Sequence, residues 1–448
     1  MKTNIIKAVE QARSSLWVLP AAITLIAGLL AFLLVEIDRR AGSNTELFRL
    51  LPWAFEGGAE SARAVLTTIA GSMITLAGTV YSITIVALTL ASMQFAPRVL
   101  RGFMRDRSNQ VVLGFFVATF TYCLLVLRTV RSEEGIEFVP GRAVAGGVVL
   151  ALVSLGMLIY FIDHIFHGIQ VSSIINSVTN ETVEQINHIY PEPWSADDLQ
   201  ADPLPGQPMR VVTLPDDWTP IPANQSGYLQ YIDYKGLFSL AVQASIVVKQ
   251  ERPNGSFVLD GGPLVYISPA SSLTPTLRGQ INAAFVLGNH PTMQQDVAYG
   301  IRRLVDIALK AISPAVNDPT TALNCIDYLG AILATLGNRK LPELDRADSS
   351  GQVRLIVYER TFHDLVRLAF DQIRHYGAAD PVIGIRLLDT IGHIAQVIKN
   401  PANREVLCEH IEKIVSGAER TIADPYELEV VRKHAAAARE KIHPSSRA

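Results

Sequence analysis

The stretch AVLTTIAGSMITLAGTVYSITIVALTLASM, residues 64–93, contains no charged side chain. About 20 apolar residues allow a helix to cross the hydrocarbon core of a bilayer, so this stretch is long enough to cross it with tilt. Hydroxyl-bearing residues and glycines interrupt its apolar residues at regular intervals. This combination decides the fold class, because it predicts a membrane helix with one polar face.

A helical wheel places these polar residues on one side of the predicted helix. With about 100° between successive residues, most of them fall within roughly 40–60° of Thr75. The opposite side is mostly Leu, Ile, Val and Ala, and Thr84 is the only hydroxyl near its centre. We call the side centred on Thr75 the hydroxyl face; it comprises Thr68, Gly71, Ser72, Thr75, Gly78, Thr79, Ser82, Val86, Thr89 and Met93.

The composition of the 448-residue chain indicates a membrane protein with a soluble part. Charged residues make up 18% of the chain, below the roughly 25% of ordinary soluble domains. The net charge of −3 and the lack of a basic stripe interleaved with aromatic residues argue against nucleic-acid binding. Cys123, Cys325 and Cys408 lie far apart and fit neither a CxxC motif nor a disulfide framework.

Four apolar segments predict four transmembrane helices, at about residues 16–36, 64–95, 111–128 and 143–163. The first is too long for a signal-peptide core and has no small-residue cleavage site after it, so we expect it to be retained. Basic residues concentrate in the N-terminal tail and in the second loop, which places both termini in the cytoplasm of a bacterial inner membrane. These basic residues are Lys2, Lys7, Arg13, Arg98, Arg101, Arg105 and Arg107.

The predicted membrane domain comprises residues 1–170. The chain that follows it divides into three predicted parts. A helical extension and a proline-rich connector occupy residues 171–209. Residues 210–270 contain short β-rich runs, among them RVVTL and LFSLAVQASIVVKQ, with an Asn254-Gly255 turn that favours a hairpin. Residues 271–442 have a helical pattern. The predicted fold class is an α-helical membrane protein with four transmembrane helices and a cytosolic α+β region.

One segment of the predicted helical part carries a dense series of helix signals. Thr292 has the position of an N-cap, and Gln295 that of its capping-box partner three residues later. Pro314 ends the helix, and Asp318 caps the next one with Pro319 at its first position. These signals predict two helices joined by a capped corner; the alternative interpretation is a ligand site.

This segment resembles the signature of the bacterial membrane proteins grouped as DUF2254, a domain of unknown function. The resemblance rests on the Gln-Asp pair and the SPAVNDPTTA run, and on residues 81–98 and 161–170. It implies four N-terminal spans and a cytosolic C-terminal region, but no activity. Pro291-Thr292 stands where the family has an Arg-Thr pair. The motif residues are Gln295, Asp296, Ser313, Pro314, Asn317, Asp318 and Pro319.

The hydroxyl face has two interpretations. Small and hydroxyl residues mediate close packing between membrane helices. The face, however, extends over about six turns, and a chain with four spans encloses no wide pore by itself. A homo-oligomeric ring would place one such helix from each copy around an axis, with Val86 and Met93 as constrictions and Arg98 and Arg101 at the cytoplasmic mouth. We therefore expect a channel for small ions, with the cytosolic part as a vestibule or gate.

The competing expectation is a non-conducting sensor or scaffold whose cytosolic part binds a ligand or partner near Asp296, Asn317 and Asp318. No nucleotide-binding, hydrolase or metalloprotease motif appears in the sequence, and no cofactor is expected, so an enzyme is disfavoured. The spans carry no charge at mid-depth, which argues against a proton-coupled transporter. The group Asp163, His164 and His167 either closes the fourth span or titrates or binds a metal there.

Overall fold

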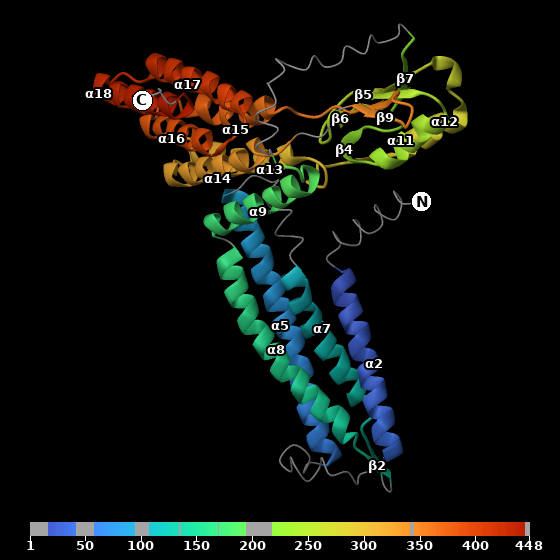
Figure 1. The fold of residues 1–448 in the computed structure, drawn as a ribbon. Helices are drawn as coiled ribbons and strands as arrows, with labels where there is room; N and C mark the ends of the chain where they lie inside the picture. The colour runs from blue at the N-terminus through green and yellow to red at the C-terminus, as the bar shows by residue number, and fades with distance from the viewer. Residues whose placement is uncertain are drawn as a thin grey trace. The chain divides into compact units, whose positions relative to one another are not determined.

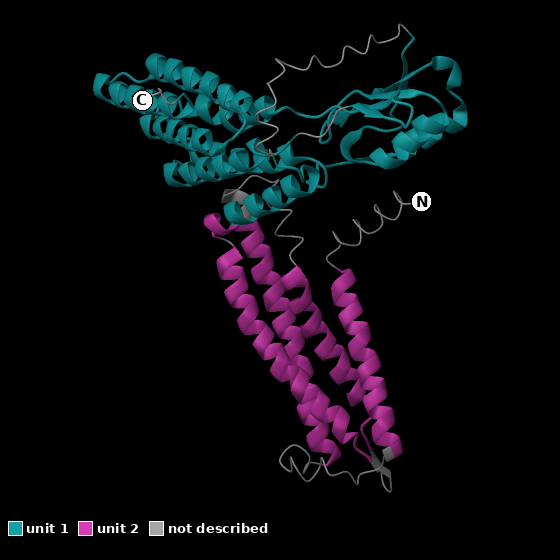
Figure 2. Ribbon diagram, viewed as in Figure 1, with its two compact units in different colours: residues 1–7, 174–448 teal, residues 8–173 magenta. Residues whose placement is uncertain are grey.

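The computed structural model describes residues 17–41, 58–94, 107–133, 136–168, 170–193, 217–340 and 345–443. The described chain forms two compact units, one within residues 8–173 and one within residues 174–448 (Figure 2). We call them the bundle unit and the C-terminal unit. Arg98, Arg101 and the predicted RVVTL strand at residues 210–214 lie outside the described residues.

The bundle unit consists of four long helices that lie side by side (Figure 1). All four are long and apolar enough to cross a membrane, as the sequence predicts. With its 36 residues, α5 is about 54 Å long, more than the roughly 30 Å of a hydrocarbon core. A two-stranded hairpin of β1 (Arg131–Glu133) and β2 (Ile136–Phe138) precedes the last helix. The four helices are α2 (Val18–Ala41), α5 (Ala59–Gln94), α7 (Arg107–Leu127) and α8 (Gly141–Gly168).

Helix α7 packs against each of the other three helices of the bundle. Its Phe116 and Tyr122 are fully buried. The Tyr122 hydroxyl donates to the carbonyl of Ala143 at 2.8 Å, and the hydroxyls of Thr119 and Ser154 are 3.0 Å apart. These bonds join α7 to α8 in a low-dielectric interior, where an unpaired hydroxyl would be costly.

The C-terminal unit contains two small sheets. The five-stranded sheet has the order β3-β7-β5-β10-β9, in which only the β5–β10 pair is parallel, and the three-stranded sheet has the order β6-β4-β8. Helices α11 (Tyr234–Gln243) and α12 (Pro275–Ala283) and the 3₁₀ turn η1 (Ala270–Ser272) pack beside them. The strands are β3 (Thr219–Pro222), β4 (Gly227–Ile232), β5 (Val247–Gln250), β6 (Phe257–Val258), β7 (Pro263–Ser268), β8 (Phe285–Gly288), β9 (Asp345–Ala347) and β10 (Val353–Ile356).

The same unit contains seven longer helices. Four of them begin with proline after an Asp or Asn cap, the arrangement in which the missing proline N–H costs nothing. Six of the seven, α13 to α18, pack together into a helical layer (Figure 1). They are α9 (Val171–Ile189), α13 (Val297–Ala311), α14 (Pro319–Gly337), α15 (Phe362–Tyr376), α16 (Pro381–Val397), α17 (Pro401–Thr421) and α18 (Pro425–Ile442).

The structure corrects the β-strand assignment of LFSLAVQASIVVKQ. Its first half is helix α11, because Asp233 caps that helix by accepting from the N–H of Gly236 at 3.0 Å. Leu237 and Ala241, four residues apart, form the buried stripe of the helix. Only the end of the run forms a strand, β5.

The prediction of a hairpin at Asn254-Gly255 is also wrong. The strand before this turn, β5, pairs with β7 and β10, whereas the strand after it, β6, pairs with β4 in the other sheet. The turn therefore takes the chain from one sheet to the other. Strands β8, β9 and β10 come from the region expected to be helical, since runs of three or four residues are too short to show a period.

Candidate functional site

The hydroxyl face of α5 points away from the rest of its bundle. Leu66, Met73 and Val80 are buried, and on the helical wheel they lie about 140–180° from Thr75. The hydroxyl residues on the face are all exposed, as is Val86. Among the residues that the structure describes, nothing approaches the positions that a Cβ would take at Gly71 or Gly78 within 4 Å. The face is thus not covered by the described part of its own chain.

The hydroxyls of this face share one hydrogen-bonding pattern. Each donates to the carbonyl four residues earlier, at 2.8–3.0 Å. A hydroxyl has one donor and two acceptor lone pairs, so its oxygen still faces outward as an acceptor. The face therefore offers a line of uncharged oxygens, on Thr68, Ser72, Thr75, Thr79, Ser82 and Thr89.

The outward faces of the neighbouring helices have a different character. Leu25 and Phe32 of α2 are 66% and 68% exposed, and Leu152 and Ile159 of α8 are 64% and 66% exposed. Large aliphatic and aromatic side chains suit contact with lipid chains, whereas a polar side chain there is costly. Within one bundle, then, α5 alone among these three helices turns small polar side chains outward.

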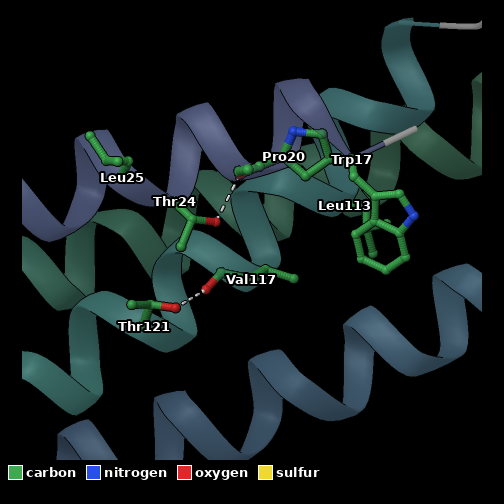
Figure 3. A pocket seen from close by; sticks show the side chains of 8 residues that line it. Trp17, Pro20, Thr24, Leu25, Leu113, Val117 and Thr121 are labelled. Carbon is green, nitrogen blue, oxygen red and sulfur yellow. Dashed lines mark hydrogen bonds between the residues drawn. The ribbon is translucent and has the colours of Figure 1, made fainter. Parts of the chain in front are cut away.

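A groove between α2 and α7 does not share this polar chemistry (Figure 3). It has a volume of about 530 Å³ and is lined mainly by apolar side chains, among them Trp17 and Leu113. The hydroxyls of Thr24 and Thr121 donate to carbonyls of their own helices at 2.8 and 2.9 Å. With those donors occupied, the groove suits an acyl chain better than a polar ligand.

The other sequence-predicted residues of the bundle do not form a cluster. Met93 lies in the last turn of α5, and its side chain is outside the described part of the structure. The ring of His167 is 3.4 Å from the carboxylate of Asp163, whereas His164 stacks on Tyr160 at 5.6 Å between ring centroids. Within the described residues, the donor atoms of Asp163, His164 and His167 do not converge as a set of three metal ligands.

In the C-terminal unit, the Gln-Asp pair has roles other than the predicted capping box. Helix α13 starts after Asp296, whose carboxylate accepts from the N–H of Ala298 at 3.1 Å. Gln295 instead bonds both backbone groups of Ile232 on β4, at 2.9 and 3.1 Å. Thr292 donates to the carbonyl of Gln230, so it does not cap the helix.

Asp296 lies at the centre of a buried polar cluster. It is 7% exposed and pairs with Arg360 at 3.0 Å, and Arg360 also donates to the carbonyl of Asn254 at 2.9 Å. Burial raises the pKa of Asp296 to about 6 and that of Glu359 to about 7, although the Arg360 guanidinium lowers both. Tyr190 donates a hydrogen bond to Glu359. Two carboxyl groups thus lie beside one guanidinium, each with a pKa that burial raises towards neutral pH.

The corner between α13 and α14 confirms the predicted caps. Asp318 accepts from the N–H and the hydroxyl of Thr321 at 3.1 and 2.6 Å, and Pro319 occupies the first helical position. The hydroxyl of Ser313 donates to the carbonyl of Lys310, and Asn317 takes a left-handed φ of 49° in the turn that follows Pro314.

The proposed pocket of Asp296, Asn317 and Asp318 is not formed. Asp296 caps one end of α13 and the other two follow its opposite end, so the 15-residue helix, about 22 Å long, separates them. The neighbours of Asp296 in the structure are Glu359 and Arg360, neither of which is among the residues predicted from the sequence. No local signal marks them, because they follow strand β10, whose pairing with β5 is long-range.

Comparison with known proteins agrees with the family resemblance. The family model described as "Predicted membrane protein (DUF2254)" matches residues 13–393. Uncharacterised proteins of Mycobacterium bovis and of Mycobacterium tuberculosis H37Rv are each 34% identical to this chain over 447 residues, covering 97% of it and 82% of the relative. An uncharacterised protein of the Mycobacterium tuberculosis strain CDC 1551 is 33% identical over the same lengths. No solved structure matches significantly. The chain therefore belongs to the DUF2254 family of predicted membrane proteins.

Proposed function

We propose that this protein is a homo-oligomeric channel for small ions in the bacterial inner membrane, with α5 of each copy lining the pore. One observation carries the proposal: the hydroxyl face of α5 is exposed and lies directly opposite the face by which α5 packs into its bundle. Such a face needs either water or a second polar surface. A cyclic ring of copies supplies both, because it brings identical faces to a common axis.

The uncharged oxygens of the hydroxyl face are suited to coordinating ions. These outward oxygens can replace part of the hydration shell of an ion. In this proposal Val86 and Met93 form apolar constrictions, and Arg98 and Arg101 lie at the cytoplasmic mouth. Both termini are cytoplasmic, and the C-terminal unit forms the vestibule or gate.

Current recordings on the reconstituted protein test the proposal. Thr79→Leu and Ser82→Leu should reduce the single-channel conductance, since they remove coordinating oxygens, and Ser82→Lys should repel cations. Thr24→Leu is the matched control, because its hydroxyl bonds to its own helix in the same way but belongs to α2. Absence of current from the wild-type protein over a range of voltage, pH and membrane tension would overturn the proposal.

The alternative is a non-conducting scaffold or sensor, in which α5 faces pack together without water and the C-terminal unit binds a ligand. The buried cluster of Asp296, Glu359 and Arg360 favours this alternative as a second candidate. Cysteines at Thr79 and Ser82 distinguish the two. In a pore they would react with water-soluble thiol reagents, whereas in a dry contact they would cross-link between copies and remain protected from those reagents.

A further inference from the structure

The beginning of α17 and the end of α18 bring three metal-binding side chains together. Glu405 and Cys408 are three residues apart on α17 and therefore share one face of that helix. His443 follows the last residue of α18, which packs against α17 (Figure 1). Within the described residues, this is the one group of three or more His, Cys, Asp or Glu side chains whose donor atoms converge.

The geometry is close to that of a metal site. The three donor atoms lie within 4.8 Å of one another, and Nε2 of His443 is 3.4 Å from a carboxylate oxygen of Glu405. Donor atoms around tetrahedral zinc, with bonds of about 2.0–2.3 Å, are about 3.3–3.7 Å apart. The Glu405–His443 distance already falls in this range, and the 4.8 Å limit on the set exceeds it by little more than 1 Å.

The donor set selects the class of metal. A thiolate sulfur, an imidazole nitrogen and a carboxylate oxygen together suit zinc, whereas magnesium and calcium prefer oxygen alone. We propose that Glu405, Cys408 and His443 form a Zn²⁺ site that joins the end of α18 to α17. Three protein ligands leave a fourth tetrahedral position for water or another ligand.

The surrounding charges are compatible with a cation at this place. The nearby Arg439 is held by Glu412 in a two-point ion pair, with N···O distances of 2.8 and 3.0 Å, so its charge is matched. Zinc binds the thiolate, so binding should release the thiol proton and weaken as the pH falls.

Zinc titration of the full-length protein in detergent tests this site. We expect one zinc ion per chain, measured by competition with a chromophoric chelator, and a higher melting temperature with zinc than with EDTA. Glu405→Gln, Cys408→Ser and His443→Gln should each weaken binding at least tenfold and abolish the zinc-dependent rise in melting temperature. Cobalt should give a thiolate charge-transfer band that is absent from Cys408→Ser.

Glu429→Gln and His434→Gln are the matched controls, since they make the same Glu→Gln and His→Gln changes outside the site, on α18. Melting in EDTA shows whether each variant folds like the wild type. The proposal would be overturned if the three site variants bound zinc with wild-type affinity, or if the controls lost as much zinc affinity as the site variants. It would also be overturned if cobalt bound without the thiolate band. Because none of these measurements depends on ion conduction, the outcome is independent of the channel proposal.

Discussion

Gly255 lies directly against Asp296: a Cβ at residue 255 would overlap a carboxylate oxygen of Asp296. Gly255 also has a φ of 81°, in the left-handed region that favours glycine. Gly255→Ala should therefore destabilise the C-terminal unit by about 2–4 kcal/mol, from backbone strain and from displacement of the buried carboxylate. Thermal unfolding of the full-length protein in detergent measures this.

The control for this variant is Gly351→Ala. Gly351 has a nearly identical φ of 80°, but no atom of the described residues lies within 4 Å of its Cβ position. Gly351→Ala should therefore lower the free energy of unfolding only through backbone strain, by about 1 kcal/mol. Equal losses in the two variants would show that contact with Asp296 contributes nothing.

The buried carboxyls should make stability depend on pH. The pKa of Glu359 is raised to about 7 in the folded chain, so its neutral form is favoured there. Its contribution to stability is complete below the unfolded pKa of about 4.3 and is lost as the pH rises through about 7. From pH 5.5 to pH 8, the wild type should lose on the order of 1–3 kcal/mol relative to Glu359→Gln. Parallel curves of stability against pH for the wild type and Glu359→Gln would contradict this prediction.

The contribution of His410 to stability should depend on pH in the opposite direction. Its ring is fully buried, neither ring nitrogen has a hydrogen-bond partner among the described residues, and the carboxylate of Asp371 is 3.7 Å from Nδ1. Burial lowers its pKa to about 4, so its contribution is complete above the unfolded pKa of about 6.5 and is lost as the pH falls through about 4.

Replacing His410 by leucine should remove this acid sensitivity. Because a buried unpaired polar group costs about 1–3 kcal/mol, His410→Leu should equal or exceed the wild type in stability at pH 7. Its advantage should grow towards pH 5, measured as the melting temperature at each pH. A loss of stability at both pH values would show that the imidazole is needed for packing or pairing.

Substitutions of glycines on the hydroxyl face test the assembly of the protein separately from the folding of the chain. The space around Gly78 is open within the described chain, so Gly78→Leu should leave the helical content and melting temperature of the monomer unchanged. If α5 faces meet, the added side chain should disrupt the oligomer, measured as its mass in detergent. Gly147→Leu, by contrast, would clash with Leu66 in the bundle core and should impair folding itself.

The sequence predicts the helical membrane part well because the signals there are local. An uninterrupted apolar run of about 20 residues has few alternatives to a spanning helix, since every backbone group must be paired in lipid. The corner at Asp318-Pro319 is predicted for the same reason, because a cap and its helix are neighbours in sequence. The period of the helix predicts that the hydroxyls share one face, but only the packing of the bundle shows that this face points away from the other helices.

Long-range pairing limits the prediction of the C-terminal unit. Strand β10 lies beside β5, about a hundred residues earlier, and its register Leu355–Val248 cannot be read from either segment alone. That pairing brings Glu359 and Arg360 to Asp296, so the buried cluster is invisible in the sequence. The spacing of Thr292 and Gln295 fits a capping box, but in the structure Asp296 caps the helix and Gln295 bonds to Ile232 of β4.

The length of the hydroxyl face has a consequence for the electrostatics of the membrane. From Thr68 to Thr89 the helix rises by about 32 Å, close to the roughly 30 Å of the hydrocarbon core. In the proposed ring, an ion would therefore meet an oxygen about once per helical turn through most of the low-dielectric layer. Its solvation would be shared among many weak sites, with no single deep binding site to hold it. Such a path favours rapid passage over tight selectivity.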